Sequence, residues 1–213
     1  MRIIAGARKG ARIFAPNGMA SCPTGDRVRE AAFNLIGPGV IEDAKVLDLF
    51  AGSGAMGLEA LSRGAAHATF VESDREACRT INRNLDKLGL DSATVLCQDV
   101  LMALRTDARA GSRYDLVLVD PPYGMFTSLQ NRLSTYLPAV LAQDGLVVVE
   151  TGAREEPELP PLTQRTSRRY GSARISLFQL APGDRTGADS LNVDKTAAPA
   201  KPVRPPDGIA SDA

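Results

Sequence analysis

The sequence predicts an α/β fold built on a doubly wound, mostly parallel sheet. Short runs rich in valine and leucine recur along the middle of the chain, and helix-like segments separate them. A glycine-rich turn joins the first of these runs to a helix. Near-continuous apolar runs are typical of strands that are buried on both faces by flanking helices. The chain has 213 residues, of which 44% are hydrophobic, so it is long enough for one well-buried domain.

Residues 1–40 are predicted to form a basic arm followed by a helix. Residues 2–6 and 11–14 are expected to be two short strands joined by a turn at Lys9-Gly10. Asp26 is expected to cap a helix that ends near Ile36, where a Gly-Pro-Gly sequence follows.

Residues 41–180 are predicted to form the main domain, with seven strands. Five are expected at 45–50, 69–72, 94–98, 115–119 and 146–149, and an antiparallel hairpin at 165–170 and 173–180 adds two. One helix is expected through Ser62 and another over 76–88, ended by Gly89. Residues 181–213 contain five prolines and no aromatic residue, so they are expected to be a disordered tail.

Composition excludes several classes of protein. No run approaches the roughly 18 apolar residues of a transmembrane helix, and the N-terminus lacks a signal peptide. We therefore expect a cytoplasmic protein without a membrane segment. The three cysteines, Cys22, Cys78 and Cys97, are widely spaced, which favours inert thiols, buried for Cys78 and Cys97, over disulfides or zinc. His67 is the only histidine and is expected at the surface, so neither a metal site nor a histidine base is expected.

Positive charge is concentrated in two places although the formal net charge is zero. Residues 1–14 carry four cations and no acid, namely Arg2, Arg8, Lys9 and Arg12. A second cluster contains Arg165, Arg168, Arg169 and Arg174. Local clusters of this kind attract a phosphate backbone whatever the total charge.

The glycine loop indicates a cofactor site. Its pattern Gly52-x-Gly54-x-x-Gly57 is shared by dinucleotide-binding and methyltransferase domains. Acidic residues at three successive strand ends favour S-adenosylmethionine over a dinucleotide. Asp48 would bind its ammonium group, Glu72 would accept hydrogen bonds from its ribose hydroxyls, and Asp99 would lie beside its adenine amino group. The sequence therefore predicts that S-adenosylmethionine is bound by Asp48, Ala51, Gly52, Ser53, Gly54, Glu72, Ser73, Asp99 and Val100.

The tetrapeptide Asp120-Pro121-Pro122-Tyr123 follows the fourth strand directly and is predicted to be catalytic. Two prolines hold this strand end extended. An exocyclic amino group on a base is a poor nucleophile, since its lone pair is delocalised into the ring. Hydrogen bonds to the Asp120 carboxylate and the Pro121 carbonyl would favour a pyramidal nitrogen, while Tyr123 stacks on the base. Attack on the sulfonium methyl then depends mainly on alignment of the reactants.

These motifs resemble the amino-methyltransferases that carry a D/N-P-P-Y/F sequence. More specifically, residues 1–180 are similar to the bacterial 16S rRNA guanine-N2 methyltransferases, through residues 2–6, residues 23–34, the glycine loop and the tetrapeptide. The resemblance implies a Rossmann-like sheet and methyl transfer from S-adenosylmethionine to the exocyclic N2 of a guanine in 16S rRNA, free or in an assembling small-subunit particle. It implies that the helix over 27–34 covers the site. We expect a monomer whose RNA contacts are Arg2, Arg8, Lys9, Arg12, Arg27 and Arg29.

Two departures from the family pattern and several alternatives stay open. The tail beyond Leu180 has no counterpart in the family. The family's Arg-Pro-Thr-Thr or Arg-Pro-Thr-Ser is here Cys22-Pro23-Thr24-Gly25, which lacks a cation and a hydroxyl. The same tetrapeptide would serve an adenine-N6 methyltransferase or a protein-glutamine methyltransferase. A nicotinamide-dependent oxidoreductase and a non-catalytic RNA-binding module on the same fold are the remaining interpretations.

Overall fold

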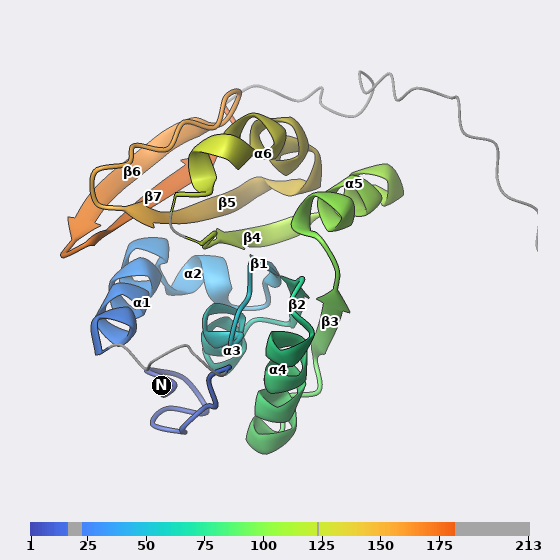
Figure 1. Cartoon of the computed structure of the whole chain (residues 1–213), viewed down its shortest axis with the longest axis vertical. Coiled ribbons are helices and arrows are strands. Elements are labelled where there is room, and N and C mark those ends of the chain that lie inside the picture. Colours follow the sequence, from blue (N-terminus) through green and yellow to red (C-terminus); the bar gives the residue numbers. More distant parts are fainter. Residues whose placement is uncertain (17–22, 123, 182–213) are drawn as a thin grey trace, which may run out of the picture.

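The sheet has seven strands in the order β3-β2-β1-β4-β5-β7-β6 (Figure 1). The computed structural model describes residues 1–16, 23–122 and 124–181. The first five strands pair in parallel, whereas β7 is antiparallel to both β5 and β6. This arrangement confirms the predicted α/β class and its closing hairpin. The strands are β1 (Lys45–Leu49), β2 (His67–Glu72), β3 (Ala93–Cys97), β4 (Tyr114–Val119), β5 (Leu141–Gly152), β6 (Thr163–Tyr170) and β7 (Ala173–Gln179).

Helices cover both faces of the sheet (Figure 1). Helices α1 to α4 pack on one face, and α5 and α6 pack on the other. Alternate residues of each central strand enter the two cores, as the pleat of a strand requires. In β4, for example, Leu116 and Leu118 join the first core, and Val117 and Val119 join the second. The helices are α1 (Pro23–Ile36), α2 (Pro38–Ile41), α3 (Ala55–Ser62), α4 (Arg75–Leu88), α5 (Val100–Ala110) and α6 (Phe126–Val140).

The strand order reverses between β1 and β4. The chain passes outward from β1 to β3, then returns to place β4 on the other side of β1. Loops that follow β1 and β4 therefore diverge at the carboxyl edge. Ligands of doubly wound sheets bind in the crevice at such a switch point, and both predicted site motifs follow these two strands.

The arm does not form the two predicted strands. One antiparallel bridge, Arg2 with Arg12, joins its two halves in residues 1–16, with hydrogen bonds from the Ile3 N–H to the Ala11 carbonyl and from the Ile13 N–H to the Met1 carbonyl. Beyond Ile3 the backbone N–H groups of Ile4 and Ala5 donate to the Glu59 carboxylate, at 2.7 and 2.9 Å, and the pairing does not extend into strands. Ile3 is buried in the same core as the sheet. The Lys9-Gly10 turn is confirmed, with a hydrogen bond from the Ala11 N–H to the Arg8 carbonyl.

Two element boundaries differ from the prediction by more than two residues. Helix α1 begins at Pro23 and contains Asp26 in its first turn, so Asp26 is not its cap; proline suits a first helical turn, since its missing N–H needs no partner there. Strand β5 starts five residues earlier than expected and runs on to Gly152, because its second half pairs with β7 over residues 147–152. No bounds had been predicted for α5 and α6.

The remaining structural predictions have mixed outcomes. Cys78 is buried as expected, whereas Cys97 is exposed at the end of β3, which corrects its assignment. His67 begins β2 and is half-buried, within 3.1 Å of the Thr94 hydroxyl. Cys22 and the tail over 182–213 lie outside the described residues. Within the described ranges, no helix has the length and apolar character needed to cross a membrane.

Candidate active site

The glycine loop between β1 and α3 is held in a conformation that ordinary residues avoid. Gly52 and Gly54 have φ angles of 54° and 78°, and Phe50 before them also has a positive φ of 59°. Gly57 is required for packing, because a Cβ atom there would lie 2.3 Å from the Phe70 ring. The loop is thus folded tightly against the sheet edge, where Gly52, Ser53 and Gly54 are buried.

Asp48 supports this loop from beneath. Its side chain accepts a hydrogen bond from the Gly57 N–H at 2.8 Å, and only 2% of the residue is exposed. Burial, and then the negative charges of Asp120 and Glu72, raise the pKa of Asp48 from 3.8 to about 8. A cationic group placed nearby would offset this penalty, as the predicted contact with the ammonium of S-adenosylmethionine requires.

The other predicted cofactor residues lie along the same edge. Glu72 accepts hydrogen bonds from the Gly52 N–H at 2.9 Å and the Asp74 N–H at 2.8 Å, so it ties the glycine loop to the turn before α4. Asp99 is exposed and caps α5 by accepting from two backbone N–H groups. Ser53 and Val100 are buried. Ala51 and Ser73 lie half-buried and exposed, respectively, in the loops after β1 and β2.

Replacing Asp48 with asparagine should raise the melting temperature more at pH 8 than at pH 5. The folded state keeps the Asp48 proton up to about pH 8, whereas the unfolded chain loses it near pH 3.8. The free energy of unfolding of the wild-type protein therefore falls as pH rises between these values, by up to about 1.4 kcal/mol per pH unit. Asparagine removes this fall and can still accept the Gly57 bond. Thermal melts at both pH values, with exposed Asp144→Asn as control, test this; equal shifts at both would contradict it.

Asp120 follows β4 at the switch point. Its N–H lies 3.5 Å from the Leu49 carbonyl at the end of β1. The residue as a whole is exposed, yet the loss of solvation at its carboxyl group raises the pKa of Asp120 from 3.8 to about 6. It is therefore mostly ionised at neutral pH and reachable from solvent.

The two prolines after Asp120 differ in their surroundings. Pro121 is buried and Pro122 is exposed. The Pro122 carbonyl accepts the Met125 N–H at 3.0 Å, whereas the Pro121 carbonyl accepts no backbone N–H of the described residues. The predicted catalytic Tyr123 lies outside the described residues.

Two acidic residues that the sequence analysis did not select belong to this region. Glu150 ends the apolar run of β5, and its pKa is raised to about 8 by burial and by the negative charge of Asp120. An acid directly after a buried strand is the same signal that identified Glu72, so Glu150 was detectable from sequence. Glu59 carried no such signal; it is fully buried inside α3.

Arg29 is an internal residue, which removes it from the predicted RNA-facing set. It is 4% exposed, and its guanidinium donates to the Arg2 carbonyl at 2.6 Å and to Asp26 at 3.0 Å. Its Nε lies 3.8 Å from a Glu59 carboxylate oxygen. Helix α1 contacts β5 and β7, and Arg29 is close enough to Glu150 to lower its pKa against the effect of burial. Helix α1 therefore places the buried cation Arg29 near the acids at the carboxyl edge of the sheet.

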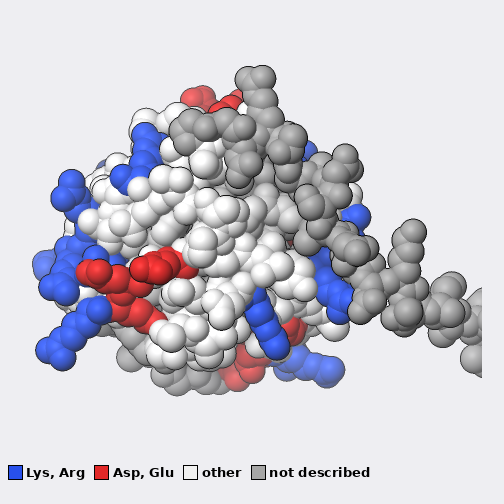
Figure 2. All heavy atoms as spheres, turned by 90° about the horizontal axis from the view of Figure 1, so that it is seen from above, with Lys and Arg blue, Asp and Glu red and all other residues white. Residues whose placement is uncertain are grey.

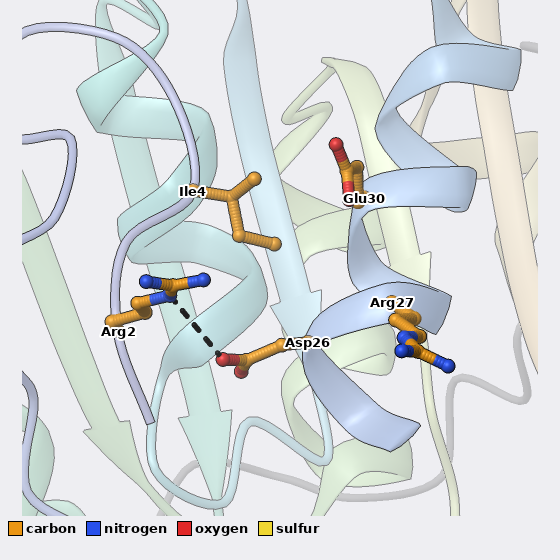
Figure 3. A pocket seen from close by; sticks show the side chains of 5 residues that line it. All are labelled: Arg2, Ile4, Asp26, Arg27 and Glu30. Atoms are coloured by element: carbon orange, nitrogen blue, oxygen red, sulfur yellow. Dashed lines mark ion pairs between the residues drawn. The ribbon is translucent and has the colours of Figure 1, made fainter. Parts of the chain in front are cut away.

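A pocket of about 350 Å³ lies between the arm and α1. Figure 3 shows Arg2 and Ile4 of the arm facing Asp26 of α1, with an Arg2–Asp26 ion pair of 4.0 Å. Arg27 and Glu30 complete its lining. Both Arg2 and Arg27 are exposed, in contrast to Arg29.

The other predicted RNA-binding cations are divided between structural and free positions. Arg8 caps α4, because its guanidinium donates to the carbonyls of Leu88 at 2.6 Å and Gly89 at 3.2 Å. Lys9 and Arg12 are exposed. In the second basic cluster Arg174 is buried and paired with Glu156 at 2.9 Å. Figure 2 shows basic and acidic side chains intermixed at the rim of one face, so its described part carries no continuous basic surface.

The fold and this edge together define the class of protein. A seven-stranded sheet with an antiparallel β7 next to β5, a glycine loop after β1 and acids at successive strand ends constitute a Rossmann-like fold of the methyltransferase type. The chain belongs to the family described as Conserved hypothetical protein 95, whose model matches residues 1–179.

Named relatives agree with this assignment. An Escherichia coli (strain K12) protein named ribosomal RNA small subunit methyltransferase D is 41% identical over 193 residues, which cover 89% of this chain and 94% of that protein. The solved structure of a hypothetical protein from Thermus thermophilus has a TM-score of 0.72 at 31% identity and covers 84% of this chain and 99% of that one. A SAM-dependent methyltransferase from Agrobacterium tumefaciens shares the fold alone, with 20% identity, a TM-score of 0.57, and 74% of this chain and 62% of that one covered.

Proposed function

We propose that this protein transfers a methyl group from S-adenosylmethionine to the exocyclic N2 of a guanine in 16S rRNA of the small ribosomal subunit. The observation that carries the proposal is the position of Asp120. Asp120 is exposed as a residue and follows β4 at the switch point, and its charge acts on Asp48, which holds the glycine loop. Methyl donor and methyl acceptor would therefore meet at one edge of the sheet.

The donor side is supported by the acids at the ends of β1, β2 and β3. A buried negative charge on Asp48 is costly without a nearby cation, so a cationic cofactor is favoured over an anionic dinucleotide. A pyrophosphate would instead face the carboxylates of Asp48, Glu72 and Asp120. The name of the E. coli relative, a methyltransferase of small-subunit rRNA, supports the same choice and disfavours the oxidoreductase interpretation.

The acceptor side is supported by the chemistry of the Asp-Pro-Pro sequence. The Asp120 carboxylate and the Pro121 carbonyl can accept the two N–H groups of a base amino group. Bound S-adenosylmethionine would supply an electrophilic methyl group: as the nitrogen formed its bond to the methyl carbon, the S–C bond would break and leave S-adenosylhomocysteine as a neutral thioether. The methylated nitrogen is acidic and loses one proton to Asp120 or to water. No histidine is needed for these steps.

Mass spectrometry of rRNA from cells with and without this gene tests the proposal. We expect one guanine of 16S rRNA to lose a methyl group at N2 in the deletion strain. The purified protein should restore it to isolated small subunits or to 16S rRNA when S-adenosylmethionine is added. Methylation of adenine or of a protein glutamine would select one of the alternatives, and an unmodified profile in both strains would favour a non-catalytic RNA-binding module.

Reversing the charge of Lys9 and Arg12 should weaken RNA binding by at least about tenfold at low salt and leave cofactor affinity unchanged. Both residues are exposed on the arm, where cations would engage phosphates. Arg8 is unsuitable for this test because it also caps α4. Filter binding of 16S rRNA to Lys9→Glu/Arg12→Glu, over a series of salt concentrations, measures the effect. Reversal of Arg105 on α5, also exposed, is the control, and equal losses in both variants would remove the arm from the RNA-binding surface.

A further inference from the structure

Glu150 and Asp120 lie side by side on the same face of the sheet. Val119 of β4 is paired with Val149 of β5, so the next residues along the two strands are Asp120 and Glu150. Neighbouring strands are about 4.8 Å apart. Leu118 and Val148 belong to the core under α1 to α4, and side chains two residues further on point to the same face. Both carboxyl groups therefore face the side that α1 covers.

Glu150 is accessible, unlike the third acid on this face. Asp48 also lies on the α1 to α4 face but is 2% exposed beneath the glycine loop. Glu150 is only half-buried and Asp120 is exposed. A substrate that reaches Asp120 can thus reach Glu150, whose side chain is longer by one methylene group.

The contacts around Glu150 give its carboxyl group no structural role. No hydrogen bond or ion pair within the described ranges uses its carboxyl group. The charged groups that act on it are Asp120 on β4, which disfavours its ionised form, and Arg29 on α1, which favours it. Its neighbour across the sheet on β7 is the apolar Ile175. A half-buried carboxyl group that no hydrogen bond or ion pair of the described residues uses is thus available to a ligand.

The hydrogen-bond donors of guanine indicate which atom of the substrate the Glu150 carboxyl group contacts. On the edge of guanine that carries N2, the ring atom N1 also bears a hydrogen, so the base offers two adjacent donors. Two adjacent carboxyl groups are the complementary acceptors. We propose that Glu150 accepts the N1–H of the target guanine while Asp120 accepts an N–H of the amino group that is methylated.

The bound state favours the required charge on Glu150. Its burial and the charge of Asp120 place the pKa of Glu150 at about 8. The positive sulfonium of the cofactor and an N1–H donor both stabilise the ionised form. An ionised Glu150 also draws the N1 proton toward itself, which increases electron density at the amino nitrogen. Adenine has a lone pair at N1 in place of the hydrogen, so this contact would select guanine over adenine.

The test uses 2-aminopurine, which keeps the amino group of guanine but has a lone pair at N1. This inference rests on the proposed function. The substrates are two synthetic rRNA segments that carry either guanine or 2-aminopurine at the methylated position, which mass spectrometry identifies. Above pH 8, the wild-type protein should methylate guanine at least about tenfold faster, the size of one lost buried hydrogen bond. In Glu150→Gln the amide can accept from N1–H or donate to an N1 lone pair, so the preference should fall by about that factor.

The outcomes distinguish a failure of the proposed function from a failure of the role of Glu150. Failure of the wild-type protein to methylate guanine would overturn the proposed function itself. Methylation of guanine without preference over 2-aminopurine, or an undiminished preference in Glu150→Gln, would overturn the role of Glu150 alone. Glu158→Gln, an exposed residue after β5, is the matched control and should keep the wild-type ratio. Contacts to O6, which 2-aminopurine lacks, are the same in all three proteins and do not change between them.

Discussion

Replacing Asp120 with alanine should reduce methyl transfer by about a hundredfold to a thousandfold, the range for removing one preorganised contact at a reacting atom. Alanine cannot accept an N–H of the target amino group, so its lone pair stays delocalised. Cofactor affinity should stay largely intact, because Asp48 and Glu72, which hold the glycine loop, are unchanged. Single-turnover rates and calorimetric titration with S-adenosylmethionine measure the two quantities. Loss of cofactor binding together with loss of rate would assign Asp120 to the cofactor site instead.

Two controls make this result specific to the carboxylate. Asparagine at position 120 keeps one carbonyl acceptor, so Asp120→Asn should retain a larger part of the rate than Asp120→Ala. In the wild-type protein the rate should fall as pH is lowered through about 6, the pKa of Asp120, because the protonated group accepts hydrogen bonds poorly. Asp120→Asn should lack this fall. A wild-type rate that is constant down to pH 5 would contradict the role of an ionised Asp120.

Replacing Glu59 with alanine should be the most destabilising single change, by about 3–5 kcal/mol. The Glu59 carboxylate is fully buried and accepts from the backbone of the arm and from Arg63, the latter at 2.7 Å. Arg29 also lies within 3.8 Å. Removal of Glu59 takes one of two carboxylates from the buried Arg29, the other being Asp26, and leaves two backbone N–H groups without an acceptor. The melting temperature should fall by roughly 10 °C for a domain of this size.

The loss of Glu59 should also affect RNA binding through the arm. Ile4 and Ala5 are held by this carboxylate, so the arm should become susceptible to proteolysis before the rest of the domain. Glu59→Gln keeps one acceptor and should show a smaller loss of stability. Glu42→Ala, at an exposed position after α2, is the control. If Glu59→Ala had the melting temperature of the wild-type protein, Ile3 and the other apolar contacts of the arm would be sufficient to hold the arm on the domain.

The strands and the site motifs were predictable because their signals are local. A buried parallel strand is a continuous apolar run, and an acid or a glycine loop directly after it marks the carboxyl edge of the sheet. Asp48, Glu72, Asp99 and Asp120 were located in this way. Glu150 has the same signal, since it directly follows the apolar run over 146–149, and it was detectable in the same way.

The errors arose where long-range contacts override local pattern. Alternating residues in the arm predict two strands, yet the pairing is limited to one bridge, and the Glu59 carboxylate, 55 residues from Ile4, holds the backbone that follows it. Arg29 looks like one more basic residue of an RNA-binding helix, but the position of α1 over β5 and β7 buries it. Periodicity reports which face of an element is apolar, and it does not report which charged side chains meet across the core.

The sequence by itself determined the α/β class, the carboxyl edge on which the site lies and the tetrapeptide that carries the proposed chemistry. Each of these depends on residues within one strand and the turn after it. Only the tertiary structure decided that Arg8 and Arg29 are structural, that Glu59 anchors the arm and that Glu150 stands beside Asp120. These assignments depend on burial and on pairing between distant elements, because the charge of a side chain acts through its surroundings and those are set by the fold.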